Sequence, residues 1–174
     1  MGTAIQNNDL GPEDFGGEEY QGCNEYLIIT RPYVIEDIHR SYLRAGSDII
    51  ETNTFGATPV VLAEYDLAHE ARRINREGAA LALKVAIEES TPEKPRYVAG
   101  SMGPTTKTIS VTGGITFEEL ANDYHIQAAG LIEGGVDLLL LETSQDTLNV
   151  KAGLEGIDRA FAELGKEIPV AVQG

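Results

Sequence analysis

Hydrophobic and polar residues alternate along this chain in blocks that predict strands and helices in turn. The clearest strand is the run of leucines at 138–141, which follows a pair of glycines and precedes a polar stretch. An apolar run this short favours a strand over a buried helix. Because the run does not alternate, we expect both of its faces to be buried, as in parallel sheets that helices cover.

The same patterns predict four helices and three further strands. Polar, glycine-rich residues 1–25 predict loops, with one short helical turn near Ala4, and Thr116 is the expected N-cap of the third long helix. Elements that alternate in this way form parallel βαβ units. The helices are predicted at about 32–45, 66–89, 117–134 and 147–165, and the strands at 47–53, 96–101 and 168–172.

Four strands and four helices fit either a small doubly wound sheet or half of an eight-stranded barrel. The half barrel is favoured because no helix follows the strand at 168–172 and no strand precedes the helix at 32–45. We therefore expect an α/β fold of parallel βαβ units, about half of a TIM-type barrel, as a single partial domain over residues 1–174. The missing barrel half is then an expected partner.

Two acidic residues stand where predicted strands end. The pattern Gly-x-Asp-apolar-Glu-Thr occurs at 46–52 and again at 135–143. Glycine and aspartate suit the turn from helix to strand, but the turn does not account for Glu51 or Glu142. Ligands bind at the carboxyl ends of parallel strands, so Glu142 is the first candidate for a binding residue.

Composition narrows the class of protein. The net charge of −15 argues against a partner nucleic acid and against an anionic membrane surface. No apolar run reaches membrane-spanning length, and no signal segment opens the chain. The single cysteine, Cys23, excludes an internal disulfide and predicts a reducing, cytoplasmic location.

Potential metal ligands are few and scattered. His39, His69 and His125 fall on predicted helices rather than at strand ends, and we expect them to be solvent-facing or partly buried. Cys23 is expected to be a structural thiol. A catalytic zinc site needs convergent ligands, so we expect this chain alone to bind no zinc.

Four segments, in order along the chain, resemble the homocysteine S-methyltransferase family. They are Met-Gly-Thr at 1–3, Glu-Thr-Asn-Thr-Phe-Gly-Ala-Thr at 51–58, Val-Ala-Gly-Ser-Met-Gly-Pro-Thr at 98–105 and Leu-Glu-Thr at 141–143. Residues 92–100 and 146–152 resemble the homocysteine-binding domain of the cobalamin-dependent methionine synthase branch in particular.

This resemblance implies a TIM-type barrel and a methyltransferase that converts homocysteine to methionine. In the family, zinc holds the substrate sulfur as a thiolate, which attacks a methyl group on cobalamin in a separate module. Zinc and cobalamin are therefore implied cofactors, and a cobalamin-carrying module is an implied partner. The family's zinc ligands are three cysteines, one after an asparagine and two adjacent after a glycine pair. Cys23 matches none of them, so we expect the chain to be inactive alone.

The resemblance also assigns substrate-binding residues. Glu142 matches the family glutamate that holds the substrate's α-ammonium group. Gly2 and Thr3 match a turn whose backbone N–H groups approach the substrate carboxylate. Asn53, Thr54, Ser101 and Thr143 would line the same mouth. The alternative for these four is that their side chains only satisfy loop backbone groups.

Two rival functions stay open at this stage. The first is phosphate binding through the glycines of 100–103 or 113–114, although their spacing fits neither a P-loop nor a dinucleotide site. The second is a non-catalytic split module that folds or functions only with a partner. Exposed edge strands would make such a module prone to association.

Overall fold

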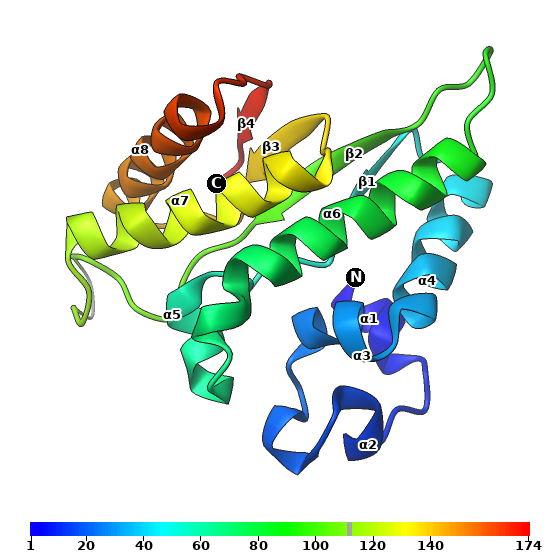
Figure 1. The fold of residues 1–174 in the computed structure, drawn as a ribbon, viewed down its shortest axis with the longest axis horizontal. Helices are drawn as coiled ribbons and strands as arrows, with labels where there is room; N and C mark the ends of the chain where they lie inside the picture. The colour runs from blue at the N-terminus through cyan, green and yellow to red at the C-terminus, as the bar shows by residue number, and fades with distance from the viewer. Residues whose placement is uncertain (111–112) are drawn as a thin grey trace.

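The computed structural model describes residues 1–110 and 113–174. Its centre is one parallel sheet in which the strands follow one another in chain order, β1-β2-β3-β4 (Figure 1). A doubly wound sheet reverses its strand order at a switch point, whereas a barrel does not. The sheet is thus the half of a TIM-type barrel that the sequence predicts. The strands are β1 (Ile49–Glu51), β2 (Tyr97–Met102), β3 (Leu138–Leu141) and β4 (Val170–Val172).

The four predicted long helices are all present. They are α4 (Pro32–Ala45), α6 (Ala71–Glu88), α7 (Phe117–Gly134) and α8 (Thr147–Leu164). Helix α6 begins later than predicted, because Asp66 has a left-handed backbone with φ of 60°. Thr116 caps α7 as predicted: its hydroxyl oxygen accepts the Glu119 N–H at 3.2 Å, and the Glu119 carboxylate accepts the Thr116 N–H at 2.8 Å.

The structure also has several short helices, most of which the sequence did not predict. Each is about one turn long, which is too short to show a helical period. The α-helical turns are α1 (Gly2–Gln6), α2 (Pro12–Phe15), α3 (Leu27–Thr30) and α5 (Pro59–Leu62). The 3-10 turns are η1 (Glu18–Tyr20), η2 (Asn24–Tyr26), η3 (Ala63–Tyr65) and η4 (Ala68–Glu70). The predicted turn near Ala4 is α1.

The long helices cover one face of the sheet, and the core lies between. Val98, Leu139 and Leu141 point toward the helices and are fully buried. Residues that alternate with them point to the opposite face, where Ile49 is 51% exposed and Leu140 is partly exposed. The prediction that β3 is buried on both faces is therefore wrong. In a barrel that face is the interior, and four strands do not enclose it.

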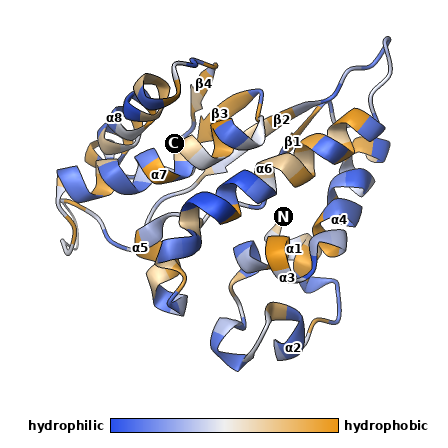
Figure 2. Ribbon diagram, in the orientation of Figure 1, coloured by the Kyte–Doolittle hydropathy of each residue, from blue (hydrophilic) through white to orange (hydrophobic). Residues whose placement is uncertain are grey.

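Figure 2 shows the same division by hydropathy, with apolar strands and helices that are apolar along one side. Glycines let the helices approach closely. A Cβ atom on Gly130 or Gly134 of α7 would lie 2.5 or 2.4 Å from the carbonyl oxygen of Arg72 or Arg76 on α6. Backbone contact at this distance fixes how α6 and α7 lie across the strands.

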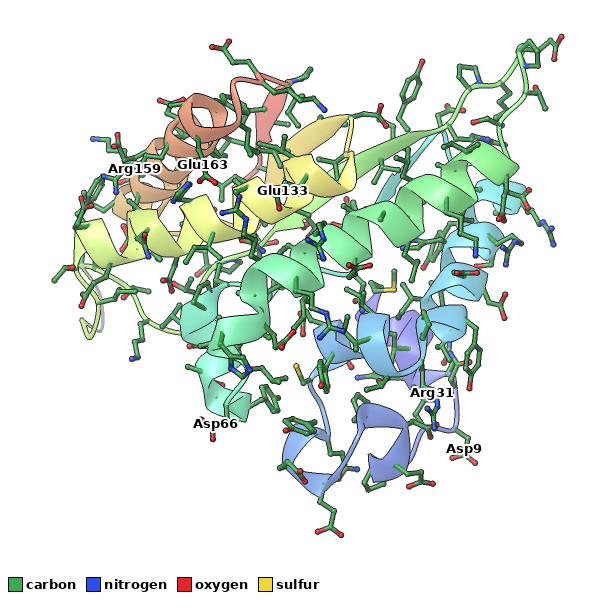
Figure 3. The ribbon with its side chains drawn as sticks, in the orientation of Figure 1. Asp9, Arg31, Asp66, Glu133, Arg159 and Glu163 are labelled. Atoms are coloured by element: carbon green, nitrogen blue, oxygen red, sulfur yellow. The ribbon has the colours of Figure 1, made fainter. Side chains whose placement is uncertain are left out.

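A charged cluster ties three of these helices together on their outer surface. The Arg72 guanidinium of α6 donates to Glu133 of α7 and to Glu163 of α8, each at 2.6 Å. Figure 3 labels Glu133 and Glu163 on these neighbouring helices. Exposed ion pairs contribute about 0–1 kcal/mol each, so the cluster adds to the orientation of the helices more than to overall stability. Among the described residues, no helix is long and apolar enough to cross a membrane.

Candidate functional site

Polar side chains gather where strands β1, β2 and β3 end. We call this group, Thr52–Thr54, Ser101, Glu142 and Thr143, the rim. Leu140 pairs in register with Ser101, and Glu142 lies two residues beyond Leu140 on the same face. The Ser101 hydroxyl donates a hydrogen bond to Glu142 Oε1 at 2.6 Å. Two residues that the resemblance assigned to substrate binding are therefore in direct contact.

The loop after β1 holds Ser101 in place from both sides of its peptide unit. Thr52 Oγ1 accepts the Ser101 N–H at 3.0 Å, and the Thr54 hydroxyl donates to the Ser101 carbonyl oxygen at 2.8 Å. The two threonine hydroxyls are 2.6 Å apart. Since the Thr54 proton goes to Ser101, Thr52 is the donor between them. Thr54 is fully buried, so its hydroxyl is not open to a ligand. It instead bonds to the Ser101 carbonyl oxygen and holds that residue in position.

Asn53 is also buried, and it links the rim to the N-terminal segment. Its side-chain amide donates to the Asn24 carbonyl oxygen at 2.7 Å. The next peptide is held from the other side, because Gln127 of α7 donates to the Thr54 carbonyl oxygen at 2.8 Å. The side chains of Asn53 and Thr54 thus both bond to backbone carbonyl groups, as expected if they serve to hold the loop and not to bind a ligand.

Glu51 shares the inner face with Glu142. Burial raises the pKa of Glu51, and the negative charge of Glu142 raises it further, while the N-terminal ammonium opposes both effects. Burial is the larger cause, and repulsion between the two carboxylates is the smaller one. Two acidic side chains on the same face make this end of the sheet electrostatically suited to a cationic group such as an ammonium.

Thr143 has an unusual backbone for a β-branched residue. Its φ of 58° lies in the left-handed region, which costs such residues about 1–2 kcal/mol. The residue is exposed at the edge of a cavity of about 430 Å³, whose lining includes Thr105, Ser144 and Asn149. Strain of this kind clusters at binding sites. It also turns the chain sharply after Glu142.

Gly2 and Thr3 form the first turn of helix α1 rather than an isolated turn. The first hydrogen bond of this helix runs from Ala4 N–H to the Met1 carbonyl at 2.9 Å. The N–H groups of the two preceding residues have no partner within the helix. A Cβ atom on Gly2 would lie 4.0 Å from the Asn24 side-chain nitrogen.

The described residues do not fit a zinc ion. No three His, Cys, Asp or Glu side chains among them come close enough to share a metal. Cys23 is buried against apolar neighbours, as expected of a structural thiol. Burial, and secondly the charge of Glu25, raise the pKa of Cys23 to about 12. A cysteine binds a metal as the thiolate, which this environment disfavours.

The histidine prediction is wrong for His39. This residue is only 2% exposed on the inner side of α4, and its Nε2 has no hydrogen-bond partner among the described residues. Burial lowers its pKa to about 4, so the ring is neutral at pH 7. His69 lies exposed in η4, and the partly exposed His125 contacts Glu163 at 2.6 Å.

The glycines at 100 and 103, the first pair of the phosphate hypothesis, do not form an open cradle. Gly100 lies inside β2, where an added Cβ would lie 3.0 Å from Leu131. Gly103 donates its N–H to the Phe55 carbonyl oxygen at 2.9 Å and lies against the Phe55 ring. These N–H groups are enclosed or used, so nothing in this segment favours a phosphate ligand.

Comparison with known proteins gives one consistent family. The sequence pattern described as homocysteine S-methyltransferase matches residues 1–174. The chain is 45% identical over 172 residues to methionine synthase of Mycobacterium leprae (strain TN), which covers 99% of this chain. It is also 45% identical over 170 residues to methionine synthase of Mycobacterium tuberculosis (strain ATCC 25618 / H37Rv), covering 98%. The chain spans 14% of the length of each of these proteins.

Solved structures agree on the fold. The metallated form of the homocysteine methyltransferase MmuM from Escherichia coli superposes with a TM-score of 0.72 at 22% identity. The match covers 91% of this chain and 58% of that one. Its apo form gives a TM-score of 0.67 at 18% identity and covers 100% of this chain and 57% of that one. The chain therefore spans just over half the length of these solved structures.

Proposed function

Because this chain belongs to the homocysteine S-methyltransferase family, we propose that residues 1–174 are part of a homocysteine-binding barrel in which Glu142 binds the substrate's α-ammonium group. The observation that supports this role is the 2.6 Å hydrogen bond from Ser101, which orients the Glu142 carboxylate at the strand end. An ionised carboxylate has several acceptor positions, so it can hold Ser101 and an ammonium together.

The other assigned residues complete the proposed site. The N–H groups at the start of α1, on Gly2 and Thr3, would donate to the substrate's carboxylate. Thr143 is exposed beside Glu142, and its hydroxyl would be a further hydrogen-bonding group for the amino-acid part of the substrate. Asn53 and Thr54 would act one step away, since their side chains hold the loop and Ser101.

Methyl transfer would require groups that this chain does not supply. A free thiol has a pKa of about 8.5 and is mostly protonated at neutral pH. Zinc would hold the substrate as the thiolate, but the donors among the described residues do not fit zinc. We propose that the zinc ligands, the other barrel half and a cobalamin-carrying module belong to the remaining length seen in the methionine synthases.

The proposed role of Glu142 can be tested with two ligands. Homocysteine and 4-sulfanylbutanoate differ only in the amino group. The parent chain should bind homocysteine about 10- to 150-fold more tightly, which corresponds to a charged hydrogen bond of about 1.5–3 kcal/mol. In Glu142→Gln this preference should be mostly lost, with affinity for the second ligand little changed.

Calorimetric titration gives both affinities, and Glu93→Gln, in the exposed turn after α6, is the matched control. The control should keep the parent's preference. A parent that binds both ligands equally, or an E142Q variant that still prefers homocysteine, would contradict the assignment.

A further inference from the structure

Two residues of the N-terminal segment hold the loop that follows β1. The Glu25 carboxylate accepts the Gly56 N–H at 2.8 Å. The neighbouring Asn24 carbonyl accepts the Asn53 side-chain amide at 2.7 Å. Both belong to the short turn η2, far along the chain from the strands. The turn η2 is therefore hydrogen-bonded to both the first and the last residue of the loop segment 53–56.

Glycine at position 56 is what allows this contact. A Cβ atom there would lie 2.9 Å from Glu25 Oε1 and 3.4 Å from a methyl group of Val61. The carboxylate can thus reach the N–H only because no side chain intervenes. On its other side η2 faces α1, since the Asn24 amide lies near Gly2. The turn connects two parts of the proposed substrate site.

Glu25 does not form a conventional ion pair. No lysine or arginine among the described residues makes a salt bridge with it, and the titratable groups near it are Cys23 and Tyr65. Burial raises the pKa of Glu25, and hydrogen bonds from backbone N–H groups only partly oppose this. Removing the Glu25 carboxyl from water costs free energy unless it forms hydrogen bonds. The bond from the Gly56 N–H offsets part of this cost and links Glu25 to the loop.

We propose that Glu25 is a positioning residue: its carboxyl fixes the loop of residues 53–56 and thereby the hydroxyls that hold Ser101 against Glu142. The connection runs from Gly56 through the two threonine hydroxyls to the Ser101 peptide, and from the Ser101 side chain to Glu142. The effect on homocysteine rests on the proposed function, whereas the effect on the loop does not.

The first test follows the Gly56 amide by NMR in the full chain. In the parent, this resonance should titrate once, with a midpoint above that of an exposed glutamate, because burial raises the pKa of Glu25. The titration should vanish in Glu25→Gln. Glu18→Gln, an exposed residue of the same segment, should leave it unchanged. A Gly56 amide that does not titrate in the parent would overturn the proposal.

The second test separates positioning from folding. In Glu25→Ala, amide exchange at Gly56 should accelerate at least tenfold and homocysteine should bind several-fold more weakly, while urea unfolding stays cooperative. Glu25→Gln keeps an oxygen acceptor and should recover most of both losses. Parent-like exchange at Gly56 in the alanine variant would refute the role of Glu25. If the parent shows no preference for the amino group but Gly56 still titrates with Glu25, only the proposed function fails.

Discussion

Leu139 and Leu140 are adjacent in sequence but face different surroundings, and this difference predicts very different costs of truncation. Leu139 is fully buried in the main core, where its side chain would lie 3.2 Å from a Cβ atom on Gly100 of β2. Removing a core leucine side chain loses transfer free energy and leaves a cavity, at about 2–5 kcal/mol. Leu140 is partly exposed on the inner face, so Leu140→Ala should cost about 1 kcal/mol.

Urea unfolding of the 174-residue chain measures both values, with the parent and both variants compared at one protein concentration. The midpoint should shift strongly for Leu139→Ala and slightly for Leu140→Ala, at an unchanged m-value. Equal costs would show that the inner face is covered in solution, for example by self-association. A neutral Leu139→Ala would contradict the packing of helices on this face.

Three further predictions follow from packing, strain and burial. Gly130→Ala should destabilise the chain by about 1–3 kcal/mol despite alanine's higher helix propensity, because the added methyl meets the Arg72 carbonyl; a more stable variant in urea melts would contradict this. Thr143→Asn should stabilise by about 0.5–1 kcal/mol, since asparagine tolerates the left-handed backbone; a lower unfolding midpoint would argue against strain. His39 binds its proton less readily when folded, with a pKa of about 4 against about 6.5 unfolded, so stability should fall by about 2 kcal/mol from pH 7 to pH 5. His39→Gln should remove most of that loss, and equal pH dependence in both proteins would exclude His39 as its source.

The sequence predicted what depends on long periodic patterns. The bounds of α4 agree with its apolar spacing, because this helix buries one side, and the start of α7 agrees with its expected cap at Thr116. Short turns such as Leu27–Thr30 carry no comparable signal. His39 was misjudged although a signal existed: Ile35 and Ile38 lie four and one positions before it, which puts all three on one side of the helix.

The inner face of β3 shows a different limit. A run of four leucines indicates apolar surroundings on both faces, but it does not say which segment covers the inner one. The contact of Ser101 with Glu142 could not be predicted from local sequence either, because these residues are 41 positions apart. Both strand ends could be identified from sequence, whereas the register that pairs Ser101 with Leu140 could not. Glu25 was missed because it lies in an aperiodic polar segment, where no pattern distinguishes it from exposed acidic residues.

The arrangement of the rim explains why most of its polar residues are buried, although the proposed ligand contacts only a few. A carboxylate that binds an ammonium is effective when its orientation is fixed before the ligand arrives. Glu142 gains that orientation from Ser101, whose peptide is held by Thr52 and Thr54, and these lie in a loop held by the N-terminal segment. Each hydrogen bond contributes only about 1 kcal/mol on its own, but bonds in a buried network support one another. The proposed recognition surface therefore depends on three strand ends and one distant turn acting together, and substitutions at that turn should affect the proposed site without touching the ligand.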